Sequence, residues 1–252
     1  MSEPVRVERE GRVAVVTVDS PPVNAIGDAV LDGLAAAAAE LGADHGVRAV
    51  VLTGAGEKAF MAGADLDELR GLLDGTVSRE EYTGRVRAVL TAWERLPQPT
   101  IAAVQAPAVG GGLEVALVCD LIVADPAARF GLPEVRLGLI PGAGGTQRLP
   151  QRIPVARAKE LLLLGSTIGA EDAQELGLVN RVSDPGGALE AALELAGRIA
   201  VLPALATRAV KQALGAGLDR EGELFRELLG SADAREGVAA FLERREPRFS
   251  PE

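Results

Sequence analysis

The stretch VGGGLEVALVCD, residues 109–120, places three consecutive glycines before a single carboxylate and a run of apolar residues. The start of a helix leaves its first backbone N–H groups unpaired, and the helix dipole adds positive potential there. Because glycine lets a ligand approach the backbone closely, this pattern predicts a buried helix whose first turn can hold an oxygen that gains negative charge. Gly111 and Glu114 lie three residues apart, which places them on one face of that helix. Taken alone, the glycine triplet fits a tight turn or close helix–strand packing equally well.

A second carboxylate follows in FGLPEVRLGLIPGAGGTQRLP, residues 130–150, where Glu134 comes directly after Pro133. Proline fixes its own backbone, so we expect this glutamate to be presented from a stiff, extended segment. The apolar neighbours of Glu114 predict that this first carboxylate is buried, which is costly unless a partner uses it. A second carboxylate on a different element would allow the two glutamates to act as an acid/base pair, and we expect at least one of them to have a pKa raised by burial and by its like-charged neighbour. The glycine turn at residues 141–145 predicts another close approach at the start of a helix.

Apolar runs of strand length alternate with helical patterns around these motifs. Residues 13–18 and 47–54 predict buried strands on either side of an alanine-rich helix at 28–41, and this β-α-β unit indicates a layered α/β fold. The elements expected next are a short helix that Asp65 could cap, a helix at about 78–96, and strands within TIAAVQAP (100–107) and CDLIVAD (119–125).

The last part of the chain shows helical patterns only. These helices are expected at roughly 187–201, 203–216, 219–229 and 231–245. Amphipathic helices in such a position commonly pack on the core or on another subunit. We therefore divide the chain into an α/β core of residues 1–186, which carries the site, and a C-terminal helical oligomerisation region of residues 187–252.

Composition excludes several classes of protein. A chain of 252 residues with 48% hydrophobic content can bury a large core without disulfides or metal. The net charge of -10 argues against nucleic acid as a partner. The single histidine, His45, and the single cysteine, Cys119, argue against zinc sites and triads built on histidine, and we expect the first to be solvated and the second to be a buried core residue. No run approaches the length of a membrane span, so we expect a cytoplasmic protein that does not bind membranes.

Six sequence blocks, in order, resemble the crotonase superfamily, which is the enoyl-CoA hydratase/isomerase family. The blocks are PPVNAI (21–26), KAFMAGADLDEL (58–69), PTIAAVQAPAVGGGLEVALVCDLIVA (99–124), RFGLPEVRLGLIPGAGGTQRLP (129–150), AKELLLLGSTIGAEDAQELGLVNRV (158–182) and GVAAFLERREPRF (237–249). The resemblance implies a crotonase-like (ClpP/crotonase) spiral of β-β-α units with a C-terminal helical region. It also implies hydration of an enoyl-CoA thioester with no metal and no cofactor, since coenzyme A (CoA) is part of the substrate.

The resemblance assigns roles to five positions. The thioester oxygen would lie between the backbone amides of Ala64 and Gly111, which form an oxyanion hole. Glu114 would hold and activate the water that attacks C3, and Glu134 would exchange a proton with C2. Gly142 matches a backbone position near that water.

The resemblance also implies a path for the CoA arm and a mode of assembly. The arm would pass the NAI loop and the AGAD segment, lined by Ala25, Ala62, Asp65, Leu66 and Asp67. Members of this family commonly form homotrimers that pair into homohexamers through the C-terminal helices. Met61 and Leu132 occupy positions that either shape the acyl pocket or belong to the core. Fatty acid metabolism is one process that uses such enzymes, and amino acid breakdown and secondary metabolism are others.

Three other functions compete with hydration. An enoyl-CoA delta isomerase would need one proton-shuttling carboxylate, so the presence of both Glu114 and Glu134 favours a hydratase. A non-catalytic acyl-CoA-binding protein is compatible with the helical tail, but the paired carboxylates argue against it. A dinucleotide-binding oxidoreductase is disfavoured because the glycine triplet lacks the spacing G-x-G-x-x-G.

Overall fold

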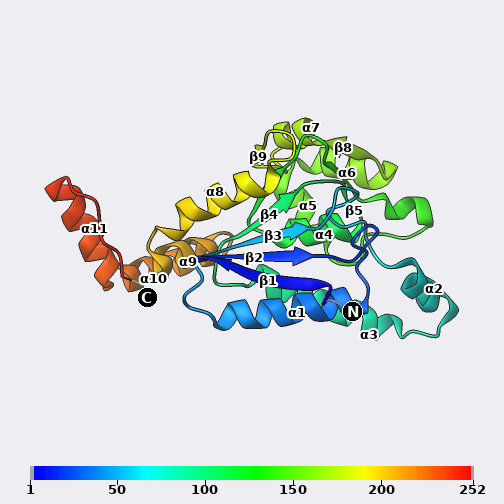
Figure 1. The fold of residues 1–252 in the computed structure, drawn as a ribbon, viewed down its shortest axis with the longest axis horizontal. Coiled ribbons are helices and arrows are strands. Elements are labelled where there is room, and N and C mark those ends of the chain that lie inside the picture. The colour runs from blue at the N-terminus through cyan, green and yellow to red at the C-terminus, as the bar shows by residue number, and fades with distance from the viewer. Residues whose placement is uncertain (1–2, 251–252) are drawn as a thin grey trace.

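A computed structural model describes residues 3–250, and a six-stranded sheet forms its centre (Figure 1). The strand order is β1-β2-β3-β4-β6-β9. β1 pairs antiparallel with β2, and the remaining neighbours in this sheet are parallel. The strands are β1 Val5–Glu10, β2 Val13–Val18, β3 Ala49–Gly54, β4 Thr100–Val104, β6 Leu121–Ala124 and β9 Arg181–Val182.

A second, three-stranded sheet and the helices complete the fold. The small sheet, which was not expected from the sequence, has the order β5-β7-β8, with β5 Ala108–Val109, β7 Arg129–Gly131 and β8 Thr167–Gly169. The helices are α1 Asp28–Ala43, α2 Leu66–Asp74, α3 Arg79–Glu94, α4 Gly111–Val118, the 3-10 helix η1 Pro133–Leu137, α5 Gly145–Arg152, α6 Val155–Leu164, α7 Ala170–Glu175, α8 Ala188–Ala200, α9 Ala204–Ala213, α10 Leu218–Leu229 and α11 Ala232–Glu243.

Successive residues of the central strands face two different apolar layers. Val50 and Leu52 of β3 belong to the larger core, together with buried residues of α1, α3 and α4. Ala49 and Val51 face the opposite side and pack with alanines of α8. Because both faces of the sheet are covered, its parallel strands are continuous apolar runs, and this is the pattern that made them recognisable in the sequence.

β1 is an edge strand that the sequence patterns did not indicate. Its valines alternate with charged side chains, and of its residues only Val5 is buried. Charged residues are typical of edge strands because they discourage pairing with other chains. They also hide the apolar signal, so the antiparallel pairing with β2 defines this strand instead.

The C-terminal helices differ in how they contact the body of the molecule. α8 contacts β3, β4 and β6, and Lys211 of α9 binds Asp120 just before β6, whereas α10 and α11 extend away from the body (Figure 1). In packing terms α8 therefore belongs with the core. The division of the chain at residue 186 and the role of the later residues in oligomerisation stay predictions. Within residues 3–250, no helix is both long and apolar enough to cross a membrane.

Candidate active site

Two glycine-containing segments meet at the start of α4. The Gly63–Ala64 segment reaches it by isolated parallel bridges between Ile26 and Ala64 and between Met61 and Ala108. A Cβ atom built on Gly111 would lie 3.7 Å from the Ala64 nitrogen, so the two predicted oxyanion-hole amides are neighbours. The structure thus brings together residues that lie far apart in the sequence.

The backbone N–H of Ala64 does not take part in the hydrogen bonds of the Ile26–Ala64 bridge. Ile26 N donates to Gly63 O at 2.8 Å, and Asp65 N donates to Ile26 O at 3.4 Å, so the residues on either side make the bonds. Gly111 is the first residue of α4, where the helix itself offers no acceptor. Among the hydrogen bonds of residues 3–250, neither amide donates to a protein acceptor. Both N–H groups therefore remain available to a ligand.

Each glycine of the triplet is needed for a different structural reason. Gly110 has φ 59° and ψ -129°, a conformation that residues with a side chain rarely adopt. A Cβ at Gly112 would lie 1.8 Å from Met61 O, so only glycine permits the close packing of α4 on that segment. The structure confirms both a turn and close packing, and Gly111 between them keeps its amide open.

Glu114 is buried, with 3% of its surface exposed. Its Oε1 accepts hydrogen bonds from Ala143 N and Gly145 N, both at 2.8 Å. Burial raises the pKa of the Glu114 carboxyl group, while the two amides and the charge of Arg148 act in the opposite direction. These amides are the partners that the buried carboxylate required. Gly142, which precedes them, faces open space.

The Glu134 side chain extends from η1 toward the glycine turn at the start of α4. A Cβ at Gly110 would lie 3.2 Å from Glu134 Oε1, and Glu134 Oε2 is buried without a hydrogen-bond partner among the described residues. Burial raises the pKa of the Glu134 carboxyl group, and the charge of Glu114 raises it further. Glu134 thus meets the expectation of a pKa raised by both burial and a like charge, whereas at Glu114 burial is the cause of the rise. The predicted extended presentation was wrong, because Pro133 begins a 3-10 helix here.

The predicted CoA-lining residues form a rim beside Ala64. Asp65 caps α2, as expected, because its side chain accepts hydrogen bonds from Asp67 N and Glu68 N. Leu66 is 76% exposed. The others, which are half-buried or exposed, are Ala25, Ala62 and Asp67. The structure gathers all five positions on two joined segments, and their contact with CoA stays a prediction.

The structure also shows the surroundings of Met61 and Leu132, whose roles the sequence left open, and of Cys119 and His45. Met61 and Leu132 are 0% and 1% exposed and belong to the main core, so the structure favours their core assignment. Cys119 is buried and His45 is exposed, as expected. No cluster of three or more side chains suited to hold a metal ion occurs in the described part of the chain.

Sequence reasoning did not identify two residues that support Glu114. Arg148 of α5 contacts the turn that binds Glu114, and Glu94 of α3 binds Arg148 through both carboxylate oxygens. Arg148 is the sole charged residue in the stretch 141–150, which is the one signal that could have drawn attention to it. Its pairing with Glu94 spans 54 positions and depends on tertiary structure.

Comparison with known proteins agrees with this geometry. The family described as "Enoyl-CoA hydratase/isomerase" matches residues 8–252. A "Short-chain-enoyl-CoA hydratase" from Clostridium acetobutylicum is 38% identical over 250 residues, covering 96% of this chain and 95% of that protein. A "Probable enoyl-CoA hydratase" from Rhizobium meliloti is 40% identical, with 98% of each chain covered. The chain therefore belongs to the enoyl-CoA hydratase/isomerase family.

Solved structures show the same fold. The crystal structure of an enoyl-CoA hydratase from Bacillus anthracis has a TM-score of 0.92 at 37% identity, covering 99% of this chain and 100% of that one. An enoyl-CoA hydratase subunit from Geobacillus kaustophilus has a TM-score of 0.91 at 41% identity, with complete coverage of both chains. The expected crotonase-like α/β fold is confirmed.

Proposed function

We propose that this protein is an enoyl-CoA hydratase, a hydro-lyase that reversibly adds water in syn fashion to a trans-2-enoyl-CoA and forms a 3-hydroxyacyl-CoA. One observation carries the proposal. Two carboxyl groups on separate elements, the buried Glu114 and the half-buried Glu134, lie near two backbone amides, Ala64 and Gly111, that have no protein acceptor among the described residues. This is the set of groups that conjugate addition to a thioester requires.

The amides answer the largest electrostatic demand of the reaction. When water attacks C3 of the enoyl group, negative charge develops on the thioester oxygen and gives an enolate-like species. The N–H groups of Ala64 and Gly111 are fixed before the substrate arrives, so they stabilise this charge without reorganisation. Losing one such donor typically costs about 2.7–4 kcal/mol of transition-state stabilisation.

The carboxyl groups divide the proton transfers. Glu114, ionised, accepts a proton from the water as its oxygen bonds to C3, and Glu134, protonated, delivers a proton to C2 as the enolate collapses. One water adds across the double bond, and the two glutamates exchange protonation states before the next turnover. The different surroundings support these roles: two amides and Arg148 favour the charged form of Glu114, while Glu134 Oε2 has no such partner in residues 3–250.

A direct assay separates the proposed activity from isomerisation. Purified protein should hydrate crotonyl-CoA, with loss of the conjugated absorbance, faster than it converts a 3-enoyl-CoA into a 2-enoyl-CoA. Isomerisation without hydration would instead assign the chain to the delta isomerases. Tight binding of acyl-CoA without either reaction would indicate the non-catalytic alternative.

The substrate and setting follow from the same proposal. The CoA arm passes the rim formed by Ala25, Ala62, Asp65, Leu66 and Asp67, and the reaction uses no separate cofactor. Cytoplasmic fatty acid metabolism is the setting that we propose. A panel of enoyl-CoA thioesters that differ in chain length and branching would identify the preferred acyl group.

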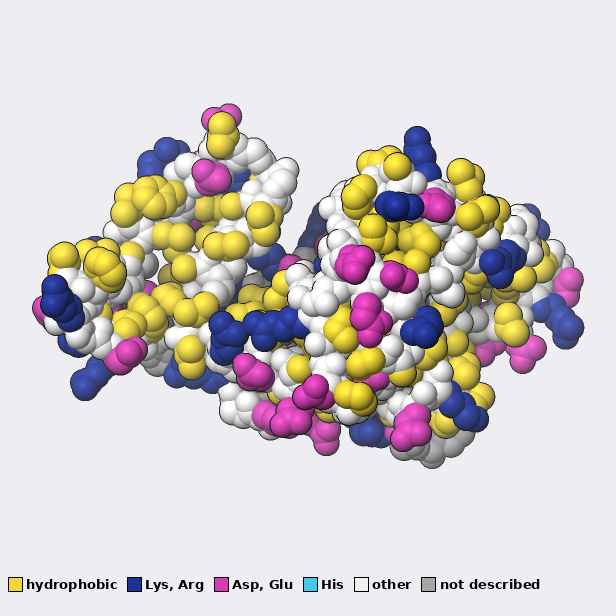
Figure 2. Space-filling model, turned by 90° about the horizontal axis from the view of Figure 1, so that it is seen from above, with side chains coloured by type: hydrophobic (Ala, Val, Ile, Leu, Met, Phe, Trp, Pro, Cys, Tyr) yellow, Lys and Arg dark blue, Asp and Glu magenta, His cyan; other side chains and the backbone are white. Residues whose placement is uncertain are grey.

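We also propose that the chain forms homotrimers or homohexamers through its C-terminal helices. Large apolar side chains on these helices lie open to solvent, among them Leu214 (78% exposed), Leu218 (83%) and Phe225 (61%). They border a groove of about 660 Å³ between α9 and α10. Figure 2 shows apolar side chains gathered over these projecting helices, which a hollow separates from the body of the molecule. Surfaces of this kind usually mark protein–protein contacts.

Sedimentation velocity tests the assembly. The native protein should sediment as a trimer or hexamer, and replacing Leu218 and Phe225 together by glutamate should shift it to smaller species. A native protein that remains monomeric at the concentrations used for assays would contradict this proposal without affecting the proposed reaction.

A further inference from the structure

Arg148 lies between α3 and the turn that holds Glu114. Its Nε and Nη2 donate to the two carboxylate oxygens of Glu94, each at 2.9 Å, and its Nη1 donates to Ala143 O at 2.8 Å. The Arg148 side chain is 15% exposed and that of Glu94 is 46% exposed, so the guanidinium group is mostly buried while the ion pair borders solvent. A bidentate contact of this type fixes the plane of the guanidinium group.

The turn itself is built directly on that guanidinium group. The Ala143 residue that accepts from Arg148 also donates its N–H to Glu114 Oε1. Gly144 has φ 107°, and a Cβ there would lie 2.1 Å from Arg148 Nη1, which means that the guanidinium fills the space behind the turn. Gly145 N then completes the pair of donors to Glu114. A continuous chain of contacts therefore runs from Glu94 to the carboxyl group of Glu114.

We propose that Arg148, held by Glu94, is a positioning residue for hydration: it fixes the 143–145 turn in the shape that presents two amides to Glu114 Oε1. The inference rests on the proposed function, because it concerns how Glu114 is kept in place for the water step. Arg148 does not touch the reacting atoms in this assignment. It acts through the turn and through its charge.

The electrostatic surroundings of Glu114 give the sign of the expected pH effect. The titratable and charged groups that interact with it are Arg148 from α5, Glu134 from η1 and Tyr82 from α3, while Glu94 of α3 interacts with Arg148. β5, which also packs on α4, carries only Ala108 and Val109. Burial raises the pKa of Glu114, and Arg148 is the cation that opposes this rise. Loss of Arg148 should therefore raise the pKa further and protonate Glu114 at higher pH.

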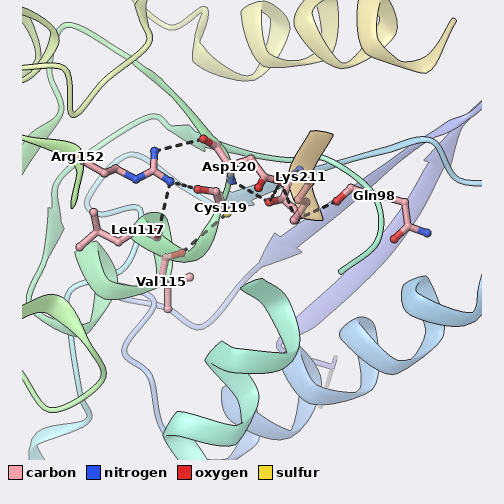
Figure 3. Close-up of polar contacts among 8 residues, drawn as sticks. Gln98, Val115, Leu117, Cys119, Asp120, Arg152 and Lys211 are labelled. Carbon is pink, nitrogen blue, oxygen red and sulfur yellow. Dashed lines mark hydrogen bonds and ion pairs between the residues drawn. The ribbon is translucent and has the colours of Figure 1, made fainter. Parts of the chain in front are cut away.

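The other arginine on the same helix provides a matched comparison. Arg152 lies one turn further along α5, and Figure 3 shows it directed at the opposite end of α4. It donates to the carbonyl oxygens of Leu117, Cys119 and Asp120. Lys211 of α9 binds the carboxylate of Asp120 on the far side of the same loop (Figure 3). Arg152 thus supports α4 without contacting the 143–145 turn.

The test compares Arg148→Gln, Arg148→Lys and Glu94→Ala with Arg152→Lys, using the pH profile of kcat/KM for crotonyl-CoA. In Arg148→Gln, kcat should fall by roughly tenfold to a hundredfold, with a smaller change in KM. The acid limb of the profile should move to higher pH, because the cation that opposes protonation of Glu114 is lost. Arg148→Lys should recover part of both effects, since it restores the charge. Arg152→Lys should lower stability and leave the acid limb in place.

Glu94→Ala distinguishes positioning from charge alone. If Arg148 acts only by its charge, removing the nearby carboxylate should move the acid limb to lower pH and leave kcat intact, which would overturn the proposal. If the turn must be held, kcat should fall and the limb should move to higher pH. Equal shifts in Arg148→Gln and Arg152→Lys, or no shift in either, would also overturn it.

A measurement that needs no turnover keeps this test separate from the proposed function. The carboxyl carbons of ¹³C-labelled glutamate can be titrated by NMR, with Glu114 assigned by its absence in Glu114→Gln. A higher pKa of Glu114 in Arg148→Gln than in the native protein supports the proposal, and an unchanged one overturns it. If the native protein failed to hydrate crotonyl-CoA, the proposed function would be wrong, but the titration would still show whether Arg148 affects the pKa of Glu114.

Discussion

Glu114 and Glu134 are the same residue type a short distance apart, yet their surroundings differ. Glu114 lies on α4, and two amides hold its Oε1. Glu134 lies on a 3-10 helix and leaves Oε2 buried with no partner among residues 3–250. The contrast shows that this fold places two identical carboxyl groups in different electrostatic surroundings: two amides and Arg148 oppose the rise in pKa that burial causes at Glu114, whereas the charge of Glu114 adds to that rise at Glu134.

Glu134→Gln should weaken catalysis more than any other single change. The amide cannot donate a carboxyl proton to C2, so hydration of crotonyl-CoA should fall by about 10²–10⁴-fold. Affinity for CoA product should change little, because the oxyanion-hole amides and the rim remain. Stopped assays for kcat and calorimetry for binding would check the two parts. Turnover near the native rate would remove Glu134 from the mechanism.

Glu114→Gln should impair the water step strongly but leave the turn in place. The amide oxygen of the new side chain can still accept from Ala143 N and Gly145 N, so the fold should keep its unfolding midpoint while kcat falls, again by the order of 10²-fold. Circular dichroism and the hydration assay would be measured on the same preparation. Intact hydration in this variant, with loss of activity confined to Glu134→Gln, would favour the isomerase alternative.

Gly112→Ala should disturb the Glu114 side of the site while leaving η1 in place. The added methyl group meets Met61 O at 1.8 Å, so α4 must shift and move Gly111 and Glu114 together. Overpacking of this kind costs about 1–3 kcal/mol in the free energy of unfolding. Urea denaturation would measure the loss. Gly197→Ala on α8, where a Cβ meets nothing within 4 Å, is the control and should be neutral or stabilising.

A stability of Gly112→Ala equal to that of Gly197→Ala would show that α4 can move away from Met61 without cost. It would contradict the view that this glycine is retained for close packing. A loss of stability with full activity would separate packing from the position of Glu114.

The sequence predicted those strands, helices and turns whose position is set by neighbouring residues in the chain. The strand at residues 13–18 and the helices predicted at 28–41 and about 78–96, which are α1 and α3 in the structure, follow from periodicity, and the glycine turn before α4 follows from the triplet. β1 was missed because charges on an edge strand mask its alternation. The segment after Pro133 was expected to be extended, but Gly138 ends it with φ 72° and permits a 3-10 helix.

The residues that support Glu114 could not be predicted from the sequence, for a different reason. The pairing of Arg148 with Glu94, and the capture of Glu114 by the 143–145 turn, are set by how α3, α4 and α5 pack. Nothing within either segment specifies its partner. The resemblance to a family indicated the positions of the reacting groups. The residues that hold Glu114 in place become apparent only in the three-dimensional structure.

The smallest predicted effect is a change in the pKa of one glutamate when the other is replaced, and it tests whether the two carboxyl groups interact electrostatically. The charge of Glu114 raises the pKa of Glu134, whereas burial alone raises that of Glu114. This asymmetry follows if Glu114 ionises first, because Glu134 is then still neutral and adds no repulsion. Glu114→Gln should therefore lower the pKa of Glu134 toward, but not down to, its ordinary value, since burial remains. Glu134→Gln should leave the pKa of Glu114 nearly unchanged.

Titration of ¹³C-labelled glutamate side chains in the two variants would measure both values. A Glu134 pKa that stays the same without the Glu114 charge would mean that the two groups lie too far apart to share one substrate. A large fall in the Glu114 pKa in Glu134→Gln would reverse the order of ionisation. The assignment of acid and base would then be exchanged, because the group that loses its proton first is the one able to accept a proton from water.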